Sequence, residues 1–132
     1  MSGSSAGPWL PPLGFGPITT RHTQAYASLS GDRNPVHLDR QAAAAAGLAG
    51  PAVHGMLLVA ILGEAAERWW PDMTIKRLST KFLAPVLVGD SVEVKGRLVA
   101  DIGSARVARL LLHSRPSMLA VIGEAHLVGC NR

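Results

Sequence analysis

The stretch from Gly55 to Trp69 limits the possible folds of this chain more than any other. Its first two turns, Met56 to Leu62, are apolar on every side, and polar residues return only from Glu64. Pro71 follows directly and ends the predicted helix. A helix that is apolar all round is typical of burial on every side rather than of a position on a surface. The rest of the chain must therefore enclose it.

Four segments after Pro71 are rich in Val, Ile and Leu and alternate partly with polar residues, which is typical of strands. Short connections between them favour an antiparallel sheet. A run of helices followed by a run of strands indicates an α+β fold. We expect one antiparallel β-sheet wrapped around the central buried helix. The predicted strands are Met73 to Leu83, Ser91 to Val99, Arg106 to His113 and Met118 to Val128.

The first part of the chain predicts an arm and a helix. The length of 132 residues suits one domain, and residues 1–17 are rich in Gly, Ser and Pro. We expect a flexible N-terminal arm over 1–17 and a single domain over 18–132. Thr19 or Thr20 can cap a helix that runs to Leu29. Helical spacing places Ala25, Tyr26 and Leu29 on its inward face.

Composition bounds the compartment and the partners. The net charge is +4, and the 13 Lys and Arg residues form no basic run, which argues against nucleic-acid binding. The single cysteine, Cys130, cannot form an intrachain disulfide, which favours a reducing compartment. The N-terminus lacks a signal-peptide pattern, and the longest apolar run, Met56 to Leu62, is too short for a bilayer. We therefore expect a cytoplasmic protein with no membrane partner.

The loop from Ser30 to Asp39 holds the densest group of polar, geometry-setting residues. Gly31 permits a turn that a side chain would oppose, and Asn34 before Pro35 is a strong loop signal. Asp32 and His37 lie on either side of this stiff bend, which can aim both side chains at one point. An acid and an imidazole aimed together are the parts of a proton-transfer site. Asp39 is interpreted as the cap of a short helix, Arg40 to Ala46.

These residues resemble a known family. The loop resembles the hydratase signature of the MaoC-like, R-specific enoyl-CoA hydratases and dehydratases, and three shorter motifs follow in the family's order. The resemblance covers about Gly16 to Val128. It implies the hot-dog fold, a long antiparallel sheet around a central helix, and dimers with active sites at the interface. The matching stretches are Tyr26 to Asp39, Ala52 to Met56, Phe82 to Asp90 and Gly123 to Ala125.

The resemblance also implies a reaction and a catalytic pair. Family members add water to a trans-2-enoyl thioester, giving an (R)-3-hydroxyacyl thioester, or catalyse the reverse dehydration. Asp32 and His37 match the pair that holds this water, and we assign them jointly as general base and acid. Asn34 would brace the loop, and Pro35 would fix the bend beside the substrate. No cofactor is implied beyond the coenzyme A thioester that serves as substrate.

Further site residues are expected on the central helix. Gly55 at its start would donate its backbone N–H to the thioester carbonyl, because amides there are unpaired and the helix dipole is positive. His54 and Met56 would shape the approach of the substrate. Many family members carry a hydroxyl further along this helix, where Gly63 stands here. That departure leaves room for a bulkier or branched acyl group, or it weakens the site.

Several simpler interpretations compete with these assignments. An aspartate and a histidine in a turn are usually a cap and a surface imidazole, but the complete motif together with His54-Gly55 favours catalysis. Gly55 could also be an ordinary helix-start glycine. Arg77 and Lys81 could meet phosphates of coenzyme A, although charges exposed at a sheet edge are the commoner case. No spacing of His, Cys and carboxylates suggests a metal site.

Three functions compete at this point. The first is a cofactor-free hydratase or dehydratase that acts as a homodimer, with acyl-CoA preferred over acyl carrier protein. The second is a non-catalytic hot-dog subunit that binds acyl groups or completes a heteromer; retention of Asp32 and His37 argues against it. The third is an acyl-CoA thioesterase. Hydrolysis has no need for the Asp-Asn-Pro-His bend, so the signature argues against this activity too.

Overall fold

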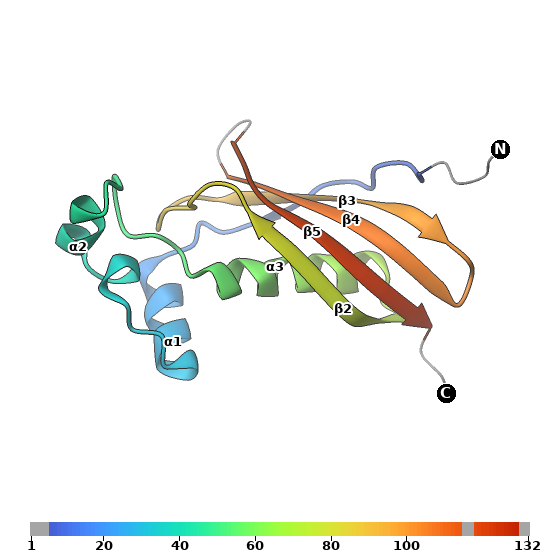
Figure 1. Ribbon diagram of the computed structural model, residues 1–132, viewed down its shortest axis with the longest axis horizontal. Coiled ribbons are helices and arrows are strands. Elements are labelled where there is room, and N and C mark those ends of the chain that lie inside the picture. The colour runs from blue at the N-terminus through green and yellow to red at the C-terminus, as the bar shows by residue number, and fades with distance from the viewer. Residues whose placement is uncertain (1–5, 115–117, 130–132) are drawn as a thin grey trace.

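The computed structural model describes residues 6–114 and 118–129. Cys130 and most of the connection expected over Ser114 to Ser117 lie outside the described residues. Helices come first and long strands last, apart from one short N-terminal strand (Figure 1). The elements are β1 (Leu13–Phe15), α1 (Thr20–Ser30), the 3₁₀ helix η1 (Pro35–His37), α2 (Arg40–Ala45), α3 (Gly55–Trp69), β2 (Met73–Phe82), β3 (Val92–Asp101), β4 (Ala105–Ser114) and β5 (Met118–Gly129).

The strands form one antiparallel sheet in the order β1-β3-β4-β5-β2. Helix α3 runs along one face of this sheet, and α1, η1 and α2 gather near its N-terminal end (Figure 1). The register places Leu112 opposite Val94 on one side and opposite Val121 on the other, so that all three face α3. The predicted α+β architecture, with an antiparallel sheet around a central helix, is confirmed.

Two glycines on the inner face of the sheet let α3 pack closely. A Cβ added at Gly96 in β3 would lie 2.5 Å from Cζ3 of Trp69. A Cβ added at Gly123 in β5 would lie 3.0 Å from Cδ1 of Leu62. Glycine inside a strand is unfavourable by itself and often marks such a close approach. These two positions therefore fix how near the helix lies to the sheet.

We predict that Gly96→Ala destabilises the protein. The added methyl group would overlap the edge of the Trp69 ring, and overpacking of this kind typically costs about 1–3 kcal/mol of unfolding free energy. Urea unfolding at one protein concentration measures the change. Gly14→Ala in β1 is the matched control, because a Cβ there meets nothing within 4 Å. Equal midpoints for the two variants would contradict the packing argument.

The N-terminal segment departs from the flexible arm expected over 1–17. Leu13–Phe15 forms the edge strand β1 and pairs with Val92–Val94 of β3. Ahead of it, the N–H groups of Gly7 and Leu10 donate to the carbonyls of Leu98 and Gly96 at 2.7 and 2.8 Å. The edge of β3 supplies acceptors that composition alone does not reveal. The described part of this segment is therefore attached to the sheet.

Helix α1 turns a different face inward from the one predicted. Thr23 and Ala27 are buried, whereas Ala25 is exposed and Leu29 is 88% exposed. Tyr26 is half-buried, so only this residue of the predicted inward set contacts the interior. Small side chains at Thr23 and Ala27 allow the helix to lie close to its neighbours. The apolar residues instead line an open pocket of about 400 Å³ between α1 and α3.

Helix α3 begins and ends where the sequence predicts, but it is not enclosed on every side. Leu58, Leu62 and Ala65 are buried against the sheet. Met56 is 61% exposed, and Ala60 on the same side is also exposed. The prediction of burial on all sides is therefore wrong for a single chain. In the described part of the chain, no helix combines the length and apolar character needed to cross a membrane.

Candidate active site

The loop after α1 is held by its own side chains. Gly31 ends the helix in the left-handed conformation, at φ 81°, and its N–H donates to the carbonyl of Ala27. The Asp32 Oδ1 atom accepts from the N–H of Asn34 at 3.2 Å, and Asn34 Oδ1 accepts from the N–H of Val36 at 3.1 Å. These bonds stabilise the bend, with Asn34 capping η1. Asp39 caps α2 through Gln41, as predicted.

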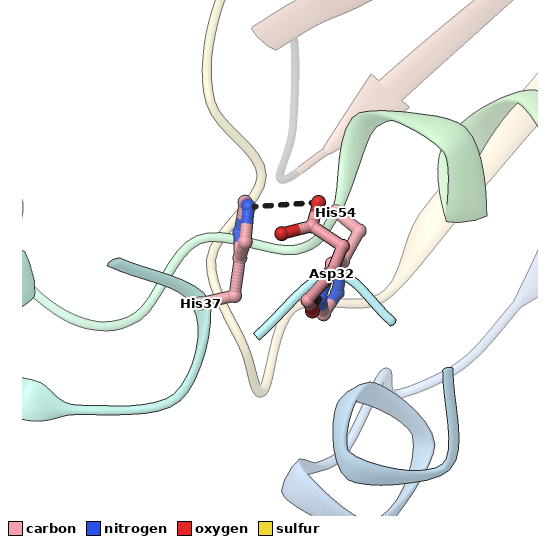
Figure 2. Close-up of side chains that lie close together, drawn as sticks. All are labelled: Asp32, His37 and His54. Atoms are coloured by element: carbon pink, nitrogen blue, oxygen red, sulfur yellow. Dashed lines mark hydrogen bonds and ion pairs between the residues drawn. The ribbon is translucent and has the colours of Figure 1, made fainter. Parts of the chain in front are cut away.

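The bend brings Asp32 and His37 together. Figure 2 shows their side chains pointing toward one another, with Oδ2 of Asp32 3.8 Å from Nε2 of His37. The Nδ1 atom of His37 donates to the carbonyl of Ala52 at 2.8 Å, because a carbonyl can only accept. A neutral His37 therefore presents the lone pair of Nε2 to Asp32. Half the surface of the Asp32 side chain is exposed, against 16% for His37, so a ligand can reach the pair.

His54 lies behind this pair. Its side chain is 1% exposed, and its ring stacks on that of His37 with centroids 4.1 Å apart. Its Nε2 atom donates to the main-chain carbonyl of Asp32 at 3.0 Å. Burial leaves little of this side chain for a substrate, so His54 supports the pair rather than lining the approach predicted for it.

Gly55 opens α3 beside the pair. Its N–H and that of Met56 have no acceptor within the helix, because the first turn of any helix lacks one. A Cβ on Gly55 would lie 3.1 Å from Cζ of Phe82, so the ring of Phe82 covers the glycine. Phe82 is a site residue that the sequence analysis missed. Phe82 is the first residue of the Phe82 to Asp90 motif, which could have marked it as a candidate. That motif does not by itself indicate a contact with Gly55.

The remaining predicted residues lie at different distances from the pair. Pro35 begins η1 within the bend and is exposed, and Met56 is exposed one residue after Gly55. Gly63 lies two turns further along α3, about 12 Å from Gly55 at the usual rise per residue. A Cβ added there would come no closer than 4.0 Å to Ile75, so a side chain would fit. The structure therefore groups Asp32, His37 and His54 near Gly55 and leaves Gly63 apart.

The cluster has poor geometry for a metal ion. Asp32, His37 and His54 each offer a ligand atom within 4.8 Å of the others. The two imidazole rings are stacked with only 25° between their planes, however, so their in-plane lone pairs do not converge on one point. The Nε2 proton of His54 is also engaged by a carbonyl. The arrangement is suited to holding a small hydrogen-bond donor against the pair.

Comparisons with known proteins agree with this fold. The family model described as the MaoC like domain matches residues 15–109. The (R)-specific enoyl-CoA hydratase of Aeromonas caviae is 36% identical over 105 residues, which cover 76% of this chain and 78% of that protein. The solved structure of the (R)-hydratase from A. caviae involved in PHA biosynthesis matches with a TM-score of 0.85 and 28% identity, covering 96% of this chain and 97% of that one.

Other relatives are far longer. The fatty acid synthase subunit beta of Gibberella zeae is 32% identical over 104 residues, yet these cover 76% of this chain and only 5% of that protein. Fold, site and comparisons together define a hot-dog protein of the hydratase and dehydratase class. The chain belongs to the MaoC-like domain family.

Proposed function

We propose that the protein interconverts trans-2-enoyl-CoA and (R)-3-hydroxyacyl-CoA by addition or loss of water. The observation that carries this proposal is the separation of 3.8 Å between Oδ2 of Asp32 and Nε2 of His37. That distance is too long for a direct hydrogen bond, and both atoms are acceptors when the imidazole is neutral. A water donating one hydrogen bond to each atom fits between them and is held for reaction.

The proposed chemistry divides between the pair and α3. In hydration, the pair accepts one proton from the water as its oxygen bonds to carbon 3 of the enoyl group. Electrons of the double bond move toward the thioester carbonyl, and carbon 2 then gains a proton from the same pair. Asp32 and His37 thus return to their starting state. The N–H of Gly55 stabilises the negative charge on the carbonyl oxygen, supported by the dipole of α3.

The substrate proposal is an acyl thioester of coenzyme A, in preference to one of acyl carrier protein. It draws on the similarity to the (R)-specific enoyl-CoA hydratase of A. caviae. Neither proposed step needs a bound cofactor. A cytoplasmic location remains a prediction from the sequence.

We further propose that the protein acts as a homodimer. The ten-residue strand β2 lies at the edge of the sheet, and long edge strands are usually covered in native proteins. Apolar residues exposed beside it supply the surface that a second copy would cover: Met56, Phe82 and Leu83. Light scattering during gel filtration should give twice the 13.8 kDa mass of one chain. A monomer at micromolar concentration would contradict this arrangement.

Loss of enoyl absorbance on crotonyl-CoA and longer trans-2-enoyl-CoAs tests the reaction. We expect hydration with the (R)-3-hydroxyacyl product, identified by coupling to an (R)-specific 3-hydroxyacyl-CoA dehydrogenase. Release of free coenzyme A from saturated acyl-CoAs would instead indicate a thioesterase. Absence of both activities across all chain lengths would favour the non-catalytic subunit.

A further inference from the structure

The least explained residue of the interior is His54. It is one of the largest fully buried side chains, and its Nδ1 atom has no hydrogen-bond partner among the described residues. A buried polar atom without a partner is costly, and an apolar side chain would fill the same space without that cost. The presence of histidine here is therefore to be explained by what the rest of the ring contacts.

Each other part of the ring has a specific contact. The Nε2 atom carries the proton, because it faces the main-chain carbonyl of Asp32, which can only accept. One face of the His54 ring stacks on the ring of His37, with 4.1 Å between the centroids. The ring of Tyr26 also packs against the His54 ring, with 4.8 Å between the centroids and 54° between the ring planes. A single side chain, 22 residues after Asp32 and 17 after His37, thus touches both members of the proton-transfer pair.

The backbone of His54 has a second role. His54 is the N-cap of α3, and its carbonyl accepts from the N–H groups of Leu57 and Leu58 at 3.0 and 3.2 Å. Gly55, the proposed carbonyl donor, follows it directly. His54 therefore connects the two halves of the site: its main chain begins the helix that carries the donor, and its side chain holds the loop that carries the pair.

We propose that His54 is a positioning residue that sets the place of Asp32 and His37 relative to the N-terminus of α3. The hydrogen bond from Nε2 fixes the backbone of Asp32, and the stacked ring fixes the plane of His37. This inference rests on the proposed hydratase function. Being buried, His54 does not touch the substrate and acts only through its neighbours.

Two variants separate the hydrogen bond from the ring. His54→Phe keeps an aromatic ring for stacking but removes the donor to the Asp32 carbonyl. His54→Gln keeps an N–H donor near the place of Nε2 but removes the ring. We expect His54→Phe to lower kcat by about 100-fold, because small displacements of reacting groups have effects of that size. The KM for crotonyl-CoA should stay within about twofold, and His54→Gln should recover part of the lost kcat.

Other results would overturn the proposal. A raised KM with unchanged kcat would make His54 a substrate contact. A loss of activity that only follows the folded fraction, judged by circular dichroism, would make its role purely structural. A kcat for His54→Gln no higher than that of His54→Phe would remove the hydrogen bond from the explanation.

A second measurement does not depend on catalysis. Hydrogen exchange followed by mass spectrometry should show faster exchange over 31–38 in His54→Phe than in the wild type, with exchange over 118–129 unchanged. Equal exchange in the loop would overturn the positioning role, whatever the reaction is. An inactive wild type that still shows the loop effect would refute the hydratase proposal and leave the positioning contact standing.

Discussion

Asp32→Asn and His37→Gln are each expected to lower kcat for enoyl-CoA hydration by about 10²- to 10⁴-fold. Either change replaces one basic group beside the gap of 3.8 Å with a neutral amide, which does not take up a proton, and leaves the water with a single proton-accepting partner. Steady-state kinetics on crotonyl-CoA measure the loss. Because both side chains are at least partly exposed and neither belongs to the apolar core, we expect the thermal midpoint to change little.

The double variant Asp32→Asn/His37→Gln tests whether the two side chains act together. Groups that act as a unit give non-additive losses, so the two changes together should cost little more than the more damaging single change. Asp39→Asn is the matched control, since an asparagine can still accept from the N–H of Gln41 and cap α2. We expect the control to keep wild-type activity. Wild-type rates in both Asp32→Asn and His37→Gln would refute the proposed mechanism.

Gly55→Pro is the second large effect we expect. Proline removes the backbone N–H yet is accepted at the first position of a helix. The preceding residue is compatible with it, because His54 has φ −57° and ψ 133°, the extended conformation that proline requires before it. Loss of one donor to the reacting carbonyl is worth about 3 kcal/mol of barrier, or roughly 100-fold in kcat.

Gly55→Ala separates the lost N–H from the added bulk. Alanine places the same Cβ 3.1 Å from the ring of Phe82 but keeps the donor. Phe82 is half-exposed and its ring can move by a few tenths of an ångström, so the alanine variant should stay within about tenfold of the wild type. Equal losses in the two variants would show that space at Gly55 matters and that its N–H does not.

Local signals account for what the sequence predicted correctly. Pro71 and the apolar run predicted the bounds of α3, and alternation predicted β2 to β5 within two residues. The edge strand β1 has only three residues, which are too few to show an alternation of apolar and polar side chains. It exists because the edge of β3 offers hydrogen-bond partners, which is a tertiary effect. The inward face of α1 was misjudged for a related reason, since small residues rather than large ones allow close packing there.

The candidate site likewise combines contacts within one local motif with contacts between residues far apart in the sequence. Asp32 and His37 are five residues apart across a proline bend, so their proximity could be predicted from a local motif. The stacking of His54 on His37 and the contact of Phe82 with Gly55 join residues 17 and 27 positions apart. Such contacts depend on how the loop, α3 and the end of β2 pack together. No spacing along the chain encodes them.

The two edges of the sheet differ, and this difference bears on how far assembly can proceed. The β3 edge is covered by the short strand β1 and by a segment that contains Pro8, Pro11 and Pro12, which have no N–H to offer another strand. The opposite edge is the ten-residue strand β2. Two copies joined through β2 by a twofold axis would present at each end only the three-residue strand β1, preceded by the proline-containing segment. Such a pair is a closed assembly, and it cannot extend strand by strand into a filament.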